Sequence, residues 1–275
     1  MSTNPVSPGQ PAATPDESAI LSIDDLSLSF GGLHVLSGVQ FDIRRAELLA
    51  LIGPNGAGKT SVLNCICGIY PPSSGNIRFL GQSLNGLRPH EVAQRGIART
   101  FQHGELIAHM SVIDNLLVAR HARMRAGLLA QGFFSRRARD EEQGHREAVE
   151  RIIEFVELER WRYAEVAGLP FGLQKVVGFA RALAMEPQLL LLDEPSSGLN
   201  RDEREDLARF ILRVRVELQI PMIWVEHDMQ MVSDLADRLV VLAHGRPLAE
   251  GSPAQVLNQP EVIEAYLGRR ARTTD

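Results

Sequence analysis

The octapeptide GPNGAGKT at residues 53–60 constrains the fold of this chain more than any other stretch. It fits the pattern G-x-x-x-x-G-K-[ST], in which glycines let the backbone wrap round phosphate groups so that successive N–H groups face the negative charge. The pattern requires a strand before it and a helix after it, and ELLALIG and TSVLNCICGIY predict both. The sequence therefore predicts a phosphate-binding loop. The residues expected to cradle the phosphates are Gly53, Pro54, Asn55, Gly56, Ala57, Gly58, Lys59, Thr60 and Ser61.

A second motif, LLLLDEP at residues 189–195, supplies two carboxylates at the end of a fully apolar strand. In α/β sheets this carboxyl end is where ligands bind. We expect Lys59 to reach the β- and γ-phosphates and the Thr60 hydroxyl to ligate Mg²⁺, with Asp193 holding the ion through water. Glu194 is then the candidate base that polarises the attacking water. An acidic helix cap after a strand is the structural alternative.

The remaining pattern predicts an α/β fold with a mainly parallel sheet. From residue 20, alternating apolar and polar residues with glycine-rich breaks predict short antiparallel strands. Strands then alternate with helices, which is typical of an α/β core. Residues 111–165 are mostly helical in pattern and would form an inserted α-helical subdomain.

Composition excludes several classes of function. A net charge of -5 and an isoelectric point near 5.9 give no electrostatic case for nucleic-acid binding. Cys65 and Cys67 lack the C-x-x-C spacing of a zinc or redox pair. No apolar run approaches the ~20 residues of a membrane-spanning helix. The first residues, rich in Pro, Ser, Thr and Ala, are expected to be a disordered leader and not a signal peptide.

Two further signals are weak alone: Gln102 in RTFQ, and His227 in WVEHD. A lone Gln or His is more often structural. Their order along the chain is more informative, because the phosphate loop, RTFQ, GLPFGLQKV, DEP, SGLN and EHD follow one another at regular intervals. In this order, over residues 21–268, the chain resembles the nucleotide-binding subunits of ATP-binding cassette transporters. The resemblance implies a P-loop NTPase core in an ATPase.

The resemblance also implies roles for the weaker signals. Gln102 would sense Mg²⁺ and the γ-phosphate and link to the membrane subunit. His227 would be the switch histidine of the catalytic site, and residues 197–200 its D-loop. Phe30 in LSFGG would stack on adenine, which needs only an exposed aromatic face. A core Phe on an alternating strand is the alternative.

The stretch GLPFGLQKV falls where this family carries its signature motif, commonly LSGGQ, which closes over the nucleotide of the opposite subunit. Here Pro170 replaces the serine, Phe171 the first glycine and Leu173 the glutamine. The missing hydroxyl removes a hydrogen bond to a charged group, worth about 1.5–3 kcal/mol. The backbone donors and the helix dipole remain, so we expect a working half-site of lower strength. Its nucleotide-contacting residues would be Leu169, Pro170, Phe171, Gly172 and Gln174.

A closer likeness comes from FQHGELIAHMSVIDNLLVARH, the helical segment to about residue 150, and PLAEGSPAQVLNQPEVIEAYLG. Together they resemble the first of the two ATPases of bacterial branched-chain amino acid uptake systems. This implies a second cassette ATPase as partner, in a heterodimer or else a homodimer, two permease subunits and a periplasmic solute-binding protein. It also places the chain at the cytoplasmic face of the inner membrane.

Alternatives within the family are lipopolysaccharide export, against which the helical segment argues, and urea or amide uptake. A soluble cassette protein that does not act in transport is a further alternative. Such proteins usually carry two cassettes in one chain or a long coiled coil, whereas this sequence has one phosphate loop and no sustained heptads. A GTPase lacks support because no N-K-x-D motif is present.

The expected division of the chain follows from these assignments. A leader at residues 1–19 precedes a nucleotide-binding domain at 20–268. Within it, the core would comprise about 20–102 and 178–250, the helical subdomain 103–177 and a C-terminal tail 251–268. Residues 269–275 would be a disordered tail.

Overall fold

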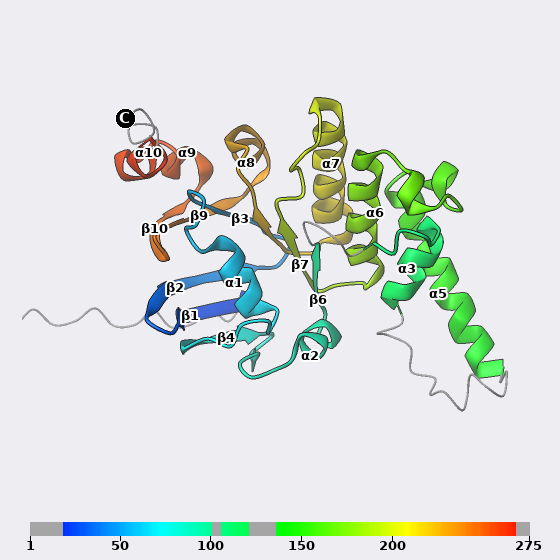
Figure 1. Cartoon of the computed structure of the whole chain (residues 1–275), viewed down its shortest axis with the longest axis horizontal. Coiled ribbons are helices and arrows are strands. Elements are labelled where there is room, and N and C mark those ends of the chain that lie inside the picture. Colours follow the sequence, from blue (N-terminus) through cyan, green and yellow to red (C-terminus); the bar gives the residue numbers. More distant parts are fainter. Residues whose placement is uncertain (1–18, 101–105, 121–135, 268–275) are drawn as a thin grey trace, which may run out of the picture.

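A computed structural model describes residues 19–100, 106–120 and 136–267 of the chain. Two sheets form its centre (Figure 1), a four-stranded sheet of order β2-β1-β4-β5 and a six-stranded sheet of order β10-β9-β3-β8-β7-β6. Five neighbouring strands of the larger sheet are parallel, and β10 pairs antiparallel with β9 at one edge. The expected fold class, an α/β core with an antiparallel N-terminal part and added helices, is confirmed.

The smaller sheet is antiparallel throughout. Its strands are β1 (Ala19–Phe30), β2 (Leu33–Arg44), β4 (Ser74–Phe79) and β5 (Gln82–Ser83). Two of them are longer than the short strands that the glycine-rich sequence predicts. Gly31 lies at the turn between β1 and β2, while Gly38 falls inside β2 beside a register shift, so that the strand continues through it.

The larger sheet is buried on both faces except at its edge strand β10, whose residues are partly or fully exposed. Its strands are β3 (Leu48–Ile52), β6 (Ile97–Thr100), β7 (Leu189–Asp193), β8 (Met222–Val225), β9 (Arg238–Ala243) and β10 (Arg246–Gly251). Every residue of β3 and β7 is buried. Alternate side chains enter different cores, since Leu49 and Leu51 pack beneath the antiparallel sheet while Leu48 and Ala50 pack against the helices. Continuous apolar sequence is what two covered faces require.

The helices lie around these sheets. They are α1 (Lys59–Ile66), α2 (Pro89–Gln94), α3 (Val112–Arg120), α5 (Arg136–Phe155), α6 (Phe171–Ala184), α7 (Arg201–Arg213), α8 (Met229–Leu235), α9 (Pro253–Val256) and α10 (Pro260–Leu267). Short 3-10 turns cover Glu159–Trp161 and Val166–Gly168, and a π-helical turn, Val214–Leu218, extends α7. Neither strand β6 nor helix α8 was predicted from the sequence. Both are short, and their patterns contain polar residues that only the tertiary contacts explain.

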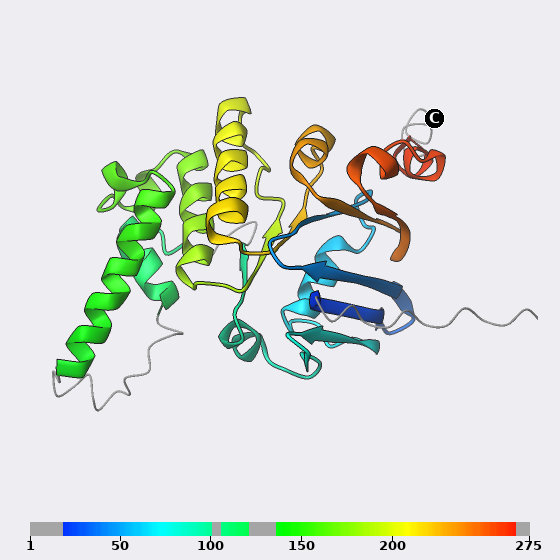
Figure 2. The same cartoon turned by 180° about the vertical axis from the view of Figure 1, so that it is seen from behind.

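Three helices, α3, α5 and α6, pack against one another on one side of the larger sheet, away from the antiparallel sheet (Figures 1 and 2). Their buried side chains, such as Leu116 and Ile153, join the same core as Leu190 of β7. The expected boundary at residues 177–178 falls within α6, and the division into subdomains stays a prediction.

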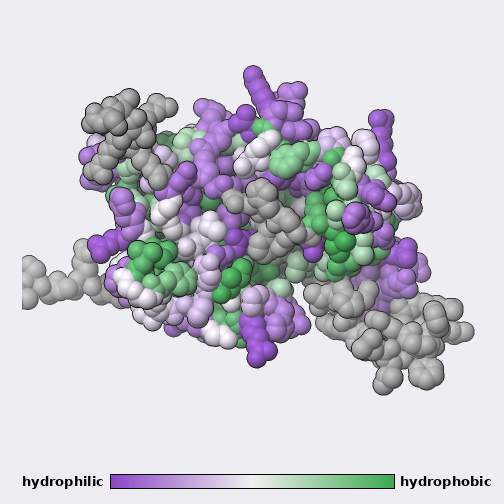
Figure 3. Space-filling model, viewed as in Figure 1, coloured by the Kyte–Doolittle hydropathy of each residue, from purple (hydrophilic) through white to green (hydrophobic). Residues whose placement is uncertain are grey.

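The surface is mixed in character. On the face drawn in Figure 3, hydrophobic residues form separate patches among hydrophilic ones. Among the residues that the structure describes, none of the helices combines the length and apolar character that a membrane crossing requires.

Candidate functional site

The phosphate loop lies between β3 and α1, in the setting that its pattern demands. Gly53 has a φ of 149° and Gly58 a φ of 101°, both in the region that favours glycine. A Cβ on Gly53 would lie 2.1 Å from the carbonyl oxygen of Leu242. The glycines therefore permit a loop conformation and a close approach to β9 that a larger residue would prevent.

Lys59 is the buried cation of this loop. Its ammonium donates to the carbonyl oxygen of Gly53 at 2.7 Å and to that of Pro54 at 3.2 Å. The ammonium is therefore held over the loop, where it faces any anion that the backbone N–H groups bind. Only 5% of the residue is exposed, so its charge acts in a setting where water screens it little.

One open pocket, of about 690 Å³, brings the loop together with the candidate base. Glu194 and His227 line it from the ends of β7 and β8. The residues that line it from the phosphate loop and the start of α1 are Asn55, Gly56, Gly58, Lys59, Thr60 and Ser61. Residues separated by more than 130 positions in sequence thus share one site, which has the volume of a small-molecule pocket.

The Glu194 side chain is held in place at this pocket. Its carboxylate hydrogen-bonds Nε2 of His227, and its backbone N–H donates to the carbonyl oxygen of Val225 at 2.9 Å. Glu194 has a φ of 47°, a left-handed conformation that is unusual for a residue other than glycine. Local backbone strain of this kind is frequent at active sites.

Behind the pair, a buried network fixes His227. The Glu226 side chain accepts a hydrogen bond from the His227 backbone N–H at 2.8 Å and another from the Ser196 hydroxyl. Glu226 is only 2% exposed. The chain that carries the histidine is therefore anchored to the segment that follows Glu194.

Asp193 is buried at the end of β7, and its two oxygens differ. Oδ2 accepts from Arg99 at 2.5 Å, whereas Oδ1 makes no hydrogen bond within the part of the chain that the structure describes. A buried acceptor without a partner is costly unless a ligand or water satisfies it. Water bound to Mg²⁺ is a suitable donor, and the Thr60 hydroxyl lies in the adjoining pocket. The residues present thus fit a magnesium ion.

Phe30 ends β1 with 48% of its surface exposed. Its ring meets that of Tyr70 edge to face, with centroids 5.1 Å apart and an interplanar angle of 81°. The ring is not a core side chain, which was the alternative to base stacking. An exposed, braced aromatic face is suited to stack on a flat base.

The signature stretch begins a helix, as the sequence indicates. Pro170 is the N-cap residue of α6, and its side chain makes no capping hydrogen bond to the helix. The Gln174 side chain donates a hydrogen bond to the carbonyl oxygen of Leu169 at 2.9 Å. Phe171 is 49% exposed, and its ring lies against Gly198 of the SGLN segment. Leu169 is buried, while Gly172 begins the buried face of the helix. These residues do not line the pocket of their own chain.

Gln102 lies outside the described residues.

Three side chains near the site were not singled out from the sequence: Arg99, Lys175 and Tyr266. Burial lowers the pKa of Lys175, and the carboxylates of Glu194 and Glu226 oppose that effect. Burial raises the pKa of the Tyr266 phenol on α10 to about 12, although the facing backbone N–H of Gly53 lowers it. The one signal in the sequence that could have indicated Arg99 is that a buried Asp193 requires a positively charged partner.

Neither Cys65 nor Cys67 forms a disulfide bond. Burial raises the pKa of Cys65 to about 12. A protonated, buried thiol packs as a small hydrophobic side chain.

Comparison with known proteins gives consistent matches. Residues 36–197 match the family model described as ABC transporter, and residues 246–272 match that described as branched-chain amino acid ATP-binding cassette transporter. The chain is 39% identical over 249 residues to the high-affinity branched-chain amino acid transport ATP-binding protein BraF of Pseudomonas aeruginosa. It is also 39% identical over 256 residues to the corresponding protein LivG of Escherichia coli. Each alignment covers 90% of this chain and 98% of the relative.

Solved structures agree. A nucleotide-free ATP-binding cassette from an ABC transporter superposes with a TM-score of 0.79 at 28% identity, covering 90% of this chain and 98% of that one. The ADP conformation of an ATP-binding cassette of an ABC transporter gives a TM-score of 0.79 at 29% identity, over 91% and 99%. With the loop, the paired carboxylates and the histidine at one pocket, the chain belongs to the ABC transporter family and is an ATPase of that family.

Proposed function

We propose that this chain is the ATP-hydrolysing subunit of a bacterial importer that takes up branched-chain amino acids. The observation that carries the choice of substrate is the match of residues 246–272 to a model specific to branched-chain amino acid cassettes. The names of BraF and LivG support it, because each aligns with nearly the whole of this chain. Transport by way of membrane permeases is the general property of the family.

Nucleotide binding rests on the loop and on Phe30. The backbone N–H groups of residues 53–60, the N-terminus of α1 and the Lys59 ammonium receive the phosphates. The exposed Phe30 ring stacks on adenine. The Thr60 hydroxyl, Asp193 through water and Gln102 would hold Mg²⁺, which would neutralise charge on the phosphates.

Hydrolysis rests on Glu194. Its carboxylate accepts a proton from water while the water oxygen bonds to the γ-phosphorus and the bond to the β-phosphate oxygen breaks. The products are ADP and inorganic phosphate. His227 keeps the carboxylate directed into the pocket through the hydrogen bond of its Nε2 atom.

The signature stretch serves a second nucleotide. The signature residues at the start of α6 do not line the pocket of their own chain among the described residues, and Phe171 is exposed. We infer that its backbone N–H groups and helix dipole close over the γ-phosphate held by a partner ATPase, Pro170 supplying no hydroxyl. The partner is a second, different cassette ATPase, so that the pair is a heterodimer.

The pair closes when ATP binds and reopens after hydrolysis, and two permease subunits convert this motion into alternating access. A periplasmic solute-binding protein delivers the amino acid. The ATPase pair lies at the cytoplasmic face of the inner membrane and is attached through the permeases.

The test is uptake by the complete transporter, reconstituted in vesicles with its permeases, second ATPase and binding protein. We expect ATP-dependent accumulation of radiolabelled leucine, isoleucine or valine that unlabelled leucine suppresses. Accumulation of labelled urea or a short amide without leucine uptake would contradict the substrate assignment while leaving the ATPase assignment intact.

A further inference from the structure

A buried ion pair lies directly behind the end of β7. One guanidinium nitrogen of Arg99 is 2.5 Å from Oδ2 of Asp193, and the two side chains are 5% and 2% exposed. The other terminal nitrogen donates to Oδ1 of Asn64 at 2.6 Å. Arg99, on β6, thus joins β7 to α1, the helix that follows the phosphate loop.

The Arg99–Asp193 ion pair changes the charge and the free oxygen atoms that Asp193 offers to a metal ion. The guanidinium occupies one carboxylate oxygen and leaves the other, Oδ1, buried and without a hydrogen bond among the described residues. Its positive charge also offsets the carboxylate charge at close range, where a buried setting screens little. A divalent cation would therefore bind here more weakly than at an unpaired carboxylate.

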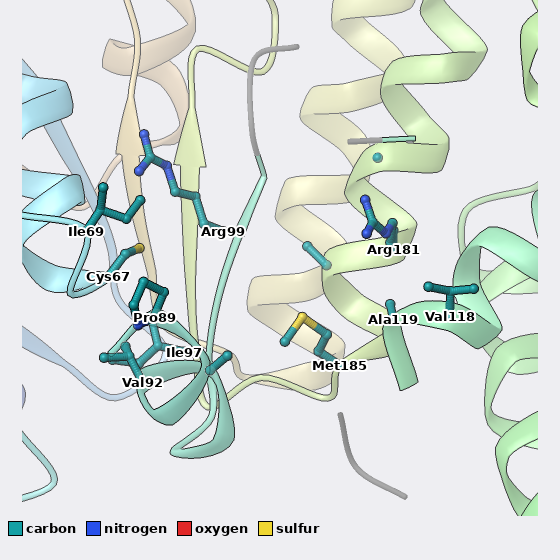
Figure 4. A pocket seen from close by; sticks show the side chains of 13 residues that line it. Cys67, Ile69, Pro89, Val92, Ile97, Arg99, Val118, Ala119, Arg181 and Met185 are labelled. Carbon is teal, nitrogen blue, oxygen red and sulfur yellow. The ribbon is translucent and has the colours of Figure 1, made fainter. Parts of the chain in front are cut away.

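The Arg99 side chain also borders a groove. Arg99 lines a groove of about 310 Å³ between α2 and β6 on one side and α6 on the other. Figure 4 shows the Arg99 side chain on the same side of the groove as Cys67 and Ile69, with its guanidinium directed away from Arg181 and Met185 on the opposite wall. The guanidinium itself is held by Asp193 and Asn64, neither of which lines this groove.

We propose that Arg99 is a positioning residue that serves as the counter-ion of Asp193 and lowers the affinity of the site for divalent metal. The guanidinium keeps the Asp193 carboxylate oriented, and metal binding depends on the phosphates that a nucleotide adds. The proposal rests on the proposed role of Asp193 in holding Mg²⁺.

The experiment uses the full chain and measures Mn²⁺ binding in the presence of ADP by electron paramagnetic resonance titration. Arg99→Gln keeps a donor for Asp193 but removes the charge, so we expect Mn²⁺ to bind at least ~10-fold more tightly. Arg99→Lys retains the charge and should remain within about threefold of the unmodified chain. The melting temperature without ligand should fall in Arg99→Gln, because Asp193 loses its counter-ion.

The matched control is Arg238→Gln. Arg238 is a partly buried arginine, with a side chain 14% exposed, that binds Glu47 at 2.8 Å and Asp42 at 3.0 Å, outside the nucleotide pocket. This variant should lower the melting temperature without changing Mn²⁺ affinity. Should Arg99→Gln not fold, Asn64→Ala removes the second anchor of the guanidinium and should tighten Mn²⁺ binding in the same direction by a smaller factor.

Unchanged or weaker Mn²⁺ binding in the folded Arg99→Gln variant would overturn the proposal. Asp193→Asn separates this outcome from a failure of the site assignment. If Asp193→Asn binds Mn²⁺ with ADP as the unmodified chain does, the metal role of Asp193 is wrong, whatever Arg99 does.

Discussion

The imidazole of His227 hydrogen-bonds the carboxylate of Glu194 across the pocket that the phosphate loop lines. The two residues follow neighbouring parallel strands, β7 and β8, and the Glu194 backbone is itself tied to Val225. These two contacts direct the candidate base towards the pocket that the phosphate loop lines. Such preorganisation means that little rearrangement of the protein is needed when water and phosphate arrive.

Lys59→Ala should abolish measurable ATP binding. The Lys59 ammonium is the buried cation of the loop and also bonds the carbonyl oxygens of Gly53 and Pro54, so its loss removes both the charge and a constraint on the loop. Isothermal titration calorimetry with ATP measures the effect. Arg78→Ala, which removes a half-exposed partner of Asp24 far from the pocket, should bind ATP normally. Undiminished binding by Lys59→Ala would contradict the loop assignment.

Pro170→Ser should slow the loss of the ATP-bound dimer, because it returns a hydroxyl to the partner's site. The backbone of Pro170, with φ of -51° and ψ of 149°, is extended, as a serine N-cap requires. The same hydroxyl should therefore cap α6 and raise the free energy of unfolding by about 1 kcal/mol.

Pro170→Ala is the control, since it removes the proline without adding a hydroxyl. Dimer lifetime is measured by light scattering after ATP is removed, and stability by urea unfolding. Equal dimer lifetimes for the serine and alanine variants would show that the backbone donors of α6 suffice.

Gly172→Ala and Gly178→Ala should differ in stability although both lie on α6. A Cβ on Gly172 would lie 2.2 Å from Oε1 of Glu203, whereas one on Gly178 meets nothing within 4 Å. Glu203 forms the capping box of α7 with Asn200, through bonds of 2.9 and 3.0 Å. Displacing it costs about 1 kcal/mol.

Gly178→Ala should instead raise the free energy of unfolding by about 0.5–1 kcal/mol, since alanine is the better helix former. Urea denaturation of both variants measures the difference, which we expect to be at least ~1 kcal/mol. Equal stabilities would mean that Glu203 rearranges at no cost and that Gly172 is not required by this contact.

The sequence predicted those parts of the fold and site that local pattern determines. The strand before Gly53, the apolar strand ending in Asp193 and the start of α6 near Pro170 each lie where their motifs place them. These features depend on glycine conformation, continuous burial and helix initiation, which are properties of neighbouring residues.

The missed features depend on tertiary contacts. Strand β6 exists because Ile97–Thr100 pairs with β7, and Arg99 matters because that pairing brings it beside Asp193, 94 positions away. Tyr266 reaches Gly53 only because α10 packs back on the core. No periodicity in the sequence predicts such long-range contacts, although a buried Asp193 does require a positively charged partner.

The assignment of Glu194 as the base is tested most directly by ATP turnover of Glu194→Gln in the intact transporter, with Glu205→Gln, an exposed carboxylate on α7, as the control. Glutamine keeps the size of the side chain and a hydrogen bond to His227 but cannot accept the proton from water. We predict normal ATP binding and turnover lower by at least ~100-fold, within the range for a positioned base. Hydrolysis by Glu194→Gln at the rate of the unmodified transporter would contradict the assignment.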